Sequence, residues 1–139
     1  MKTILLIEDD TALRENTAEL LELSNYEVIT APNGKIGIQK ALQEKPDIVV
    51  CDIMMPEVDG YGVLEALAKN QHTQNVPFIF LSAKTEHKEI RKGMDLGADD
   101  YLTKPFDEEE LISAVESRLA KAKILAQNKV EPIKVEVEK

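Results

Sequence analysis

Residues 46–60 of the chain read P-D-I-V-V-C-D-I-M-M-P-E-V-D-G. Residues 48–51 form an apolar run that has the length and composition of a buried strand. Asp52 ends this run, and Pro56 and Gly60 predict a loop directly after it. Packing alone does not explain a carboxylate at the tip of so apolar a strand. The residues that the fold brings near Asp52 must therefore account for it.

Length and composition limit the possible classes of protein. The chain has 139 residues, 43% of them hydrophobic, which suits one globular domain with a real core. It has no apolar run of the roughly 18 residues that a membrane span needs. Its net charge of −9 argues against a nucleic-acid surface and suits a site for divalent cations. A single cysteine, Cys51, excludes an internal disulfide and agrees with a cytoplasmic location.

Strand-like and helix-like segments alternate along the chain. The expected strands are residues 3–8, 26–31, 47–52, 77–82 and 99–102, and the expected helices are 11–23, 33–44, 61–69, 85–96 and 107 to about 128. Five such βα repeats predict an α/β fold, a doubly wound parallel sheet with helices on both faces. The flavodoxin-like strand order 2-1-3-4-5 suits a chain of five strands.

Capping signals support several of these boundaries. Asp10 and Asn33 are expected to cap the helices that follow them, and Asp107 with Glu110 resembles a capping box. Gly97 is expected just after the fourth helix, whose thin apolar stripe includes Met94. Residues 129–139 alternate valine with charge and fit no repeat, so we assign residues 1–125 to the domain and residues 126–139 to a tail or the start of a linker.

Polar residues gather where the predicted strands end. Glu8 and Asp9 follow the first strand, Asp52 ends the third, Ser82 ends the fourth and Lys104 follows the fifth. Ligands of such sheets bind at the carboxyl ends of the strands, beside the switch point between the first and third strands. We therefore expect the three acids to converge in one crevice, with the serine and the lysine on its other side.

This set of side chains suits phosphoryl chemistry. Three neighbouring carboxylates stay ionised more easily with a hard cation among them, and Mg²⁺ or Mn²⁺ prefers such oxygen ligands. The metal, Lys104 and the Ser82 hydroxyl together resemble a clamp for phosphoryl oxygens. Asp52 then takes the role of nucleophile and forms an aspartyl phosphate. The plainer alternative, a structural salt-bridge network, leaves excess negative charge unpaired.

Four motifs carry a resemblance to a known family. They are L-L-I-E-D-D, D-I-V-V-C-D-I-M-M-P-E-V-D-G, F-I-F-L-S-A and G-A-D-D-Y-L-T-K-P-F. In this order, each at a strand end, they resemble the chemotaxis-regulator-like receiver domain of bacterial two-component response regulators. The resemblance covers roughly residues 2–122. It implies a phosphorylation switch that gains and loses its own phosphoryl group without a turnover substrate, and hence no enzyme in the usual sense.

The resemblance also implies roles for the metal site and the phosphoacceptor. Asp52 corresponds to the phosphoacceptor and also to a metal ligand. Asp9 corresponds to a direct metal ligand, and Glu8 to the acid that holds the metal, often through water. Met54 corresponds to the position whose backbone carbonyl binds the metal. The implied phosphoryl donor is a phosphohistidine on a sensor histidine kinase or a phosphotransfer protein.

Four further positions correspond to the switch. Ser82 corresponds to the hydroxyl that moves to bond the phosphoryl oxygen, and Lys104 to the cation that pairs with it. Pro105 corresponds to a proline preceded by a cis peptide bond. Tyr101 corresponds to the aromatic side chain that turns inward after the hydroxyl has moved.

The output of such a switch stays open at this point. The segment is either the N-terminal part of a longer transcriptional regulator or a stand-alone regulator or phosphorelay intermediate. Family members also commonly dimerise through the fourth helix, fifth strand and fifth helix. The charged residues expected on such a face are Lys88, Arg91, Lys92, Asp99, Asp100, Glu110 and Arg118. We expect no direct nucleic-acid or membrane binding by this segment.

Two other functions share part of this pattern. A small phosphatase of the haloacid dehalogenase type also uses an aspartyl phosphate, but it needs a second acid two residues after the nucleophile. Met54 occupies that position here. A flavodoxin-like cofactor binder needs a phosphate-binding loop after the first strand, where the acids from Glu8 to Asp10 would repel a phosphate.

Overall fold

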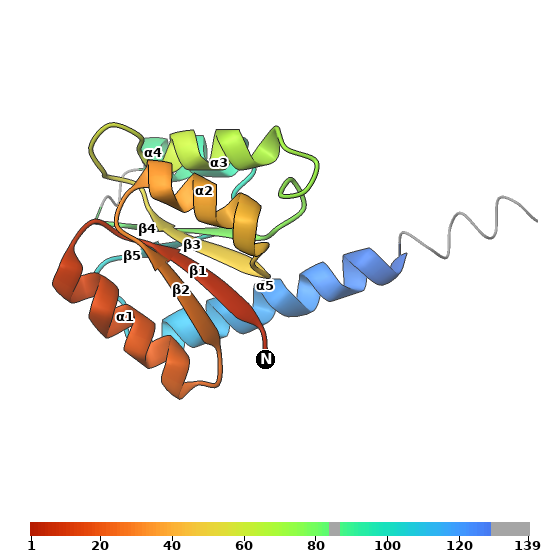
Figure 1. The fold of residues 1–139 in the computed structure, drawn as a ribbon, viewed down its shortest axis with the longest axis horizontal. Coiled ribbons are helices and arrows are strands. Elements are labelled where there is room, and N and C mark those ends of the chain that lie inside the picture. Colours follow the sequence, from red (N-terminus) through yellow and green to blue (C-terminus); the bar gives the residue numbers. More distant parts are fainter. Residues whose placement is uncertain (84–86, 129–139) are drawn as a thin grey trace, which may run out of the picture.

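The computed structural model describes residues 1–83 and 87–128. It has one parallel sheet of five strands in the order β2-β1-β3-β4-β5, which confirms the predicted doubly wound fold (Figure 1). The strands are β1 (Thr3–Ile7), β2 (Glu27–Ala31), β3 (Ile48–Asp52), β4 (Phe78–Ser82) and β5 (Asp100–Thr103). The helices are α1 (Thr11–Leu23), α2 (Gly34–Glu44), α3 (Gly60–Ala68), α4 (His87–Asp95) and α5 (Glu108–Asn128).

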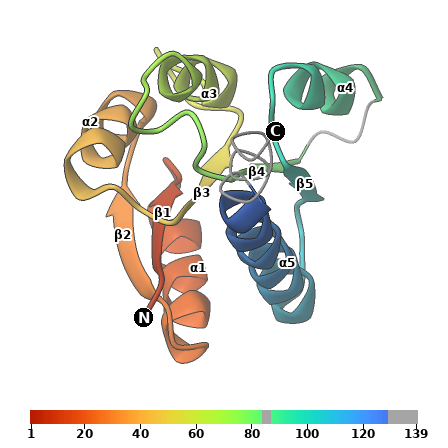
Figure 2. The ribbon, with the colours of Figure 1, turned by 90° about the vertical axis from the view of Figure 1, so that its right-hand side faces the viewer.

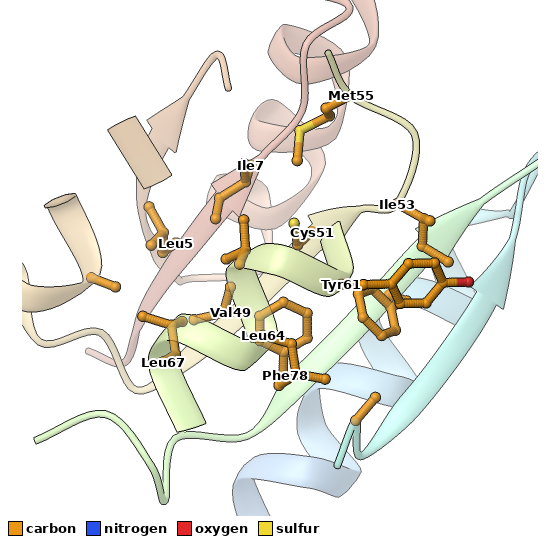
Figure 3. Close-up of a cluster of buried hydrophobic side chains, with 14 of the residues drawn as sticks. Leu5, Ile7, Val49, Cys51, Ile53, Met55, Tyr61, Leu64, Leu67 and Phe78 are labelled. Carbon is orange, nitrogen blue, oxygen red and sulfur yellow. The ribbon is translucent and has the colours of Figure 1, made fainter. Parts of the chain in front are cut away.

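The helices cover the two faces of the sheet. Figure 2 shows α2, α3 and α4 on one face and α1 and α5 on the other. Successive residues of a strand point to opposite faces, so the buried strands supply two separate cores. The core under α3 contains Leu5, Ile7, Val49, Cys51, Phe78, Phe80, Tyr61, Leu64 and Leu67 (Figure 3). The core under α1 and α5 contains Ile4, Leu6, Val50, Ile79, Leu81, Leu21, Leu111 and Val115.

The predicted caps are present. The Asp10 carboxylate accepts a hydrogen bond of 3.0 Å from the N–H of Leu13, and Asn33 caps α2 in the same way. Asp107 and Glu110 bond each other's backbone N–H groups, at 2.7 Å and 3.3 Å, which is the predicted capping box. The left-handed φ of +107° at Gly97 agrees with its predicted place after α4.

The packing of α4 differs from the predicted apolar stripe. The Met94 side chain is 43% exposed, whereas Gly93 is buried. A Cβ atom built on Gly93 would lie 2.9 Å from two carbon atoms of the Phe80 ring, so the helix backbone itself packs on this ring. The fourth helix was expected to begin at residue 85, and residues 84–86 lie outside the described residues. Within the described part of the chain, none of the helices is long and apolar enough to cross a membrane.

Candidate functional site

The acidic crevice forms where β1 and β3 end side by side. Ile7 pairs with Cys51 in the parallel register, so Glu8 and Asp52 follow at the same level on neighbouring strands. One carboxylate oxygen from each of Glu8, Asp9 and Asp52 lies within 4.8 Å of the others. These three acids are the ones that sequence reasoning expected to meet, because parallel strands bring their carboxyl ends to one edge.

Two of the three acids are buried, and this sets their protonation. Glu8 is 1% exposed and Asp52 is 5% exposed, whereas Asp9 is exposed. Burial raises the pKa of Glu8 to about 7, with a further contribution from the charge of Asp52. Burial also raises the pKa of Asp52. A hard divalent cation fits this donor set, because it offers only carboxylate oxygens and an excess of negative charge.

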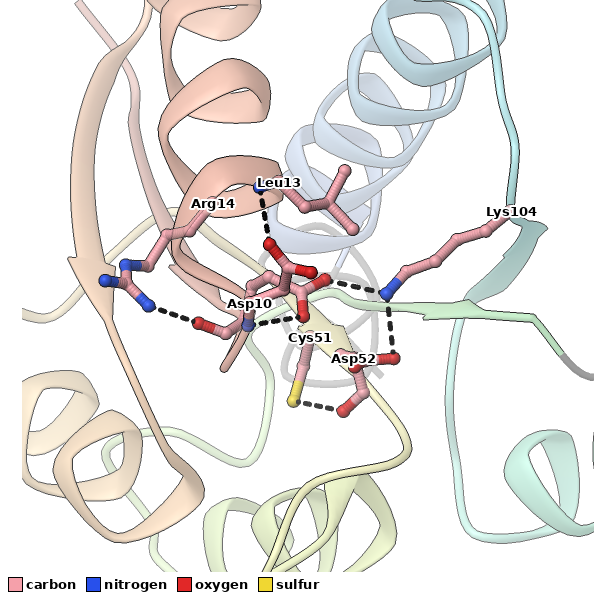
Figure 4. A network of polar contacts seen from close by, with 7 residues as sticks. Asp10, Leu13, Arg14, Cys51, Asp52 and Lys104 are labelled. Carbon is pink, nitrogen blue, oxygen red and sulfur yellow. Dashed lines mark hydrogen bonds and ion pairs between the residues drawn. The ribbon is translucent and has the colours of Figure 1, made fainter.

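Lys104 joins the two buried acids. Its Nζ lies 2.7 Å from Oε1 of Glu8 and 3.3 Å from Oδ1 of Asp52 (Figure 4). Burial alone would lower the pKa of Lys104, but the hydrogen bonds and charges of the two acids outweigh this effect and raise it. The lysine therefore stays cationic in the crevice. The backbone N–H of Lys104 donates to the carbonyl of Ser82 at 2.8 Å, and the peptide bond to Pro105 is cis.

Hydrogen bonds between side chains and backbone groups hold the turn after β1. The N–H of Asp10 donates to Oε2 of Glu8 at 3.2 Å. The guanidinium of Arg14 donates from Nη1 to the carbonyl oxygen of Glu8 at 2.8 Å (Figure 4). Sequence reasoning missed Arg14, because its position one turn inside α1 carries no signal that it reaches back over the strand end.

The loop after β3 is held equally closely. The N–H of Ile53 donates to the carbonyl of Leu81 at 3.1 Å, and the N–H of Gly60 donates to the carbonyl of Ile53 at 2.8 Å. A Cβ atom at Gly60 would lie 2.5 Å from the carbonyl oxygen of Asp52. Only glycine fits at this close approach of the two backbone segments. Met54 lies in the loop with its side chain 58% exposed.

Comparison with known proteins identifies the fold family. A family model described as the response regulator receiver domain matches residues 4–116. The chain belongs to this family. This receiver domain is 38% identical over 127 residues to the DNA-binding dual master transcriptional regulator RpaA of Synechocystis, a match that covers 91% of this chain and 53% of RpaA. The chain thus spans about half the length of the curated relatives it matches.

Solved structures agree with this assignment. The receiver domain protein from Clostridium thermocellum superposes with a TM-score of 0.84 at 28% identity, over 90% of this chain and 99% of that one. The receiver domain of the Pseudomonas aeruginosa sensor histidine kinase PA1611, described with a magnesium ion coordinated in its active site cleft, superposes with a TM-score of 0.80 at 25% identity. That match covers 86% of this chain and 98% of the other.

The two predicted switch residues of this receiver domain, Ser82 and Tyr101, lie on β4 and β5. Ser82 is fully buried at the end of β4, and its neighbour Leu81 pairs with Asp52 in the register of the sheet. The hydroxyl-bearing residue therefore lies one position beyond Asp52 on the adjacent strand. Tyr101 is half-buried in β5, is paired with Phe80 and packs against the core on the α3 side.

Proposed function

We propose that this receiver domain accepts a phosphoryl group on Asp52 from a phosphohistidine of a sensor histidine kinase or a phosphotransfer protein. The observation that carries the proposal is the contact of one lysine with both buried acids of a cluster of three carboxylates. A structural salt-bridge network would neutralise its charges, whereas three carboxylates around one lysine retain negative charge that suits a cation. The function is a switch, with no turnover substrate.

The ligands of the metal in this proposal are the carboxylates of Glu8, Asp9 and Asp52 and the backbone carbonyl of Met54. Mg²⁺, or Mn²⁺ in its place, supplies positive charge against the oxygens of the transferred group when it is bound. The PA1611 receiver domain, with its coordinated magnesium ion, supports this choice of cation.

The side chains of the site carry out the remaining steps of phosphoryl transfer. A carboxylate oxygen of Asp52 attacks phosphorus, while the bond from phosphorus to the imidazole nitrogen of the donor breaks and that nitrogen keeps the electron pair. Lys104 stays cationic and pairs with a phosphoryl oxygen, which compensates the charge that arrives. The Ser82 hydroxyl donates to another phosphoryl oxygen, and Tyr101 turns inward behind it. Hydrolysis of the acyl phosphate returns the free carboxylate.

The output proposed for the domain is transcriptional. RpaA is a DNA-binding regulator about twice as long as the part that matches, which favours a receiver domain of residues 1–125 at the N-terminal side of a longer regulator. Residues 126–139 then begin a linker, and the protein acts in the cytoplasm. A stand-alone regulator or phosphorelay intermediate is the alternative.

Homodimerisation through α4, β5 and α5 also belongs to the proposal. Two of the charged residues expected on that face, Asp100 and Arg118, pair with each other within the chain at 3.4 Å. Lys88 and Arg91 of α4 are exposed and leave this face with basic groups for a partner, whereas the ammonium group of Lys92 lies over the ring of Tyr61.

Mass spectrometry of the intact protein after incubation with acetyl phosphate tests the phosphorylation site. We expect the wild type to gain one phosphoryl group only with Mg²⁺, and Asp52→Asn to gain none. Asp10→Asn is the matched control, because it removes a neighbouring acid while asparagine still caps α1. Equal phosphorylation of wild type and Asp52→Asn would refute the assignment, and so would a gain independent of divalent metal.

A further inference from the structure

Tyr61, the second residue of α3, contacts α4 through both its hydroxyl group and its ring. Its hydroxyl lies 2.8 Å from Oε2 and 3.1 Å from the carbonyl oxygen of Glu89, in the first described turn of α4. The ammonium group of Lys92 lies 4.4 Å above the centre of the Tyr61 ring, which is a cation–π contact. One side chain therefore binds two residues of α4 through its hydroxyl group and its ring.

The helix also lies very close to this aromatic side chain. The Cβ position of Gly93 is 3.8 Å from Cε1 of Tyr61 and 2.9 Å from the ring of Phe80. The two rings meet edge to face, with centroids 5.4 Å apart. Gly93 is the buried residue of α4, whose other described side chains are half-buried or exposed. The rings of Tyr61 and Phe80 thus both pack against the middle of α4 at Gly93.

The same tyrosine is tied to the backbone of the proposed phosphoacceptor. Gly60, its neighbour, donates to Ile53, and the Cβ position of Gly60 is 2.5 Å from the Asp52 carbonyl oxygen and 3.0 Å from the Phe80 ring. Figure 3 shows the Tyr61 ring beside Ile53, between α3 and the sheet. The backbone at Asp52 therefore cannot shift far without displacing Gly60, and Tyr61 with it.

The hydroxyl of Tyr61 remains a donor under ordinary conditions. The side chain is buried, and burial, followed by the hydrogen bond and charge of Glu89, raises the pKa of Tyr61 above its usual value. Its bond to the Glu89 carboxylate is charge-assisted and part-buried, which makes it stronger than a bond between neutral groups.

We propose that Tyr61 is a positioning residue that anchors α4 in the unphosphorylated arrangement and couples its position to the state of Asp52. The inference rests on the proposed function, since it needs a modification at Asp52 that shifts α4. If phosphorylation moves α4 off this anchor, the anchor opposes the phosphorylated state. By thermodynamic linkage, weakening the anchor then tightens the binding of any ligand that selects the phosphorylated state.

A purely structural role for Tyr61 predicts a different result. If the ring only fills the core under α3, phenylalanine replaces it with the same apolar contacts. Tyr61→Phe would then leave ligand affinity at Asp52 unchanged, because the hydroxyl would have no part in the switch. The variant keeps the ring contact with Phe80, so the two roles can be separated without disrupting the fold.

The experiment uses beryllofluoride with Mg²⁺ as the probe of the phosphorylated state, with affinity measured by titration calorimetry. Tyr61→Phe is expected to bind beryllofluoride about fivefold more tightly than wild type, which corresponds to one net hydrogen bond. Tyr26→Phe is the matched control, because Tyr26 packs against the core on the opposite face of the sheet. Equal or weaker binding by Tyr61→Phe, or the same gain in Tyr26→Phe, would overturn the inference. Failure of wild type to bind beryllofluoride would count against the proposed function.

A second measurement reports the anchor itself. The chain has three tyrosines, so uniform 3-fluorotyrosine labelling gives three ¹⁹F resonances, which single Tyr→Phe variants assign. Beryllofluoride is expected to move the Tyr61 resonance and leave the Tyr26 resonance in place. In Gly93→Ala, the added methyl group presses α4 away from the Phe80 ring, so the unliganded Tyr61 resonance should shift toward its beryllofluoride position. An unchanged Tyr61 resonance in the liganded wild type would refute the coupling.

Discussion

Replacing Glu8 with glutamine is expected to stabilise the metal-free domain above about pH 7, although it removes a buried ion pair. The reason is that Glu8 lies almost fully buried beside a second acid, Asp52. Glutamine keeps one oxygen that accepts from Lys104, and the lysine keeps its contact with Asp52. The N–H of Asp10, which donates to the other Glu8 oxygen in the wild type, then faces the glutamine NH2 group. The substitution thus removes the excess charge at the cost of one hydrogen bond, from the N–H of Asp10.

The size of the effect follows from the pKa of Glu8, which burial raises from 4.5 to about 7. Each pKa unit corresponds to about 1.4 kcal/mol, so ionising this carboxyl in the folded protein costs at most about 3.5 kcal/mol. Solvent reaches the crevice beside the exposed Asp9, and this screening reduces the cost to about 1–2 kcal/mol. The lost hydrogen bond offsets about 0.5–1 kcal/mol of this, so the net gain is up to about 1 kcal/mol. For a domain of this size, such a gain raises the melting temperature by about 2–4 °C.

The pH dependence has a definite sign. The folded protein binds the Glu8 proton more tightly than the unfolded chain, so the stability of the wild type falls as the pH rises from 4.5 to about 7. Below this window both states are protonated at Glu8, and above it the full cost applies. The advantage of Glu8→Gln should therefore increase through the window and then stay constant.

Urea unfolding followed by circular dichroism, in the presence of EDTA, measures this advantage. Glu19→Gln is the matched control, because it neutralises an exposed acid of α1. Saturating Mg²⁺ should stabilise the wild type more than Glu8→Gln, since the glutamine offers the cation no charge. A wild type more stable than Glu8→Gln in EDTA above pH 7, or a difference between them that does not vary with pH, would refute the reasoning.

Three further changes test other parts of the domain. Gly60→Ala is expected to cost more than about 2 kcal/mol of unfolding free energy, because its Cβ meets the Asp52 backbone. Gly62→Ala, whose Cβ meets two side-chain atoms, a Val58 methyl at 3.1 Å and Oδ1 of Asp59 at 3.6 Å, but no backbone, is its control, and equal losses would contradict the argument. Asp10→Ala should cost about 1 kcal/mol through the lost N-cap of α1, and no loss in urea unfolding would contradict this expectation. Cys51 is fully buried and burial raises its pKa, so a thiol reagent should label it only as fast as the protein unfolds, and rapid labelling would oppose this.

The sheet and its acidic crevice were predictable from the sequence because both depend on short-range patterns. Apolar runs ending in Glu8 and Asp52, with helices between them, require a parallel sheet, and a parallel sheet brings strand ends together. The caps at Asp10 and Asp107 were predictable for the same reason, because a cap bonds backbone groups only two or three residues away.

Other contacts of the site were decided by the tertiary structure alone. The reach of Arg14 to the carbonyl of Glu8, and the shorter contact of Lys104 to Glu8 than to Asp52, depend on how a helix or a loop approaches the strand ends. The anchor from Tyr61 to α4, and the burial of Gly93 in place of Met94, depend on how closely two helices pack on one strand. Residue spacing specifies the face of a helix, but the distance between elements is set by the side chains of every layer between them.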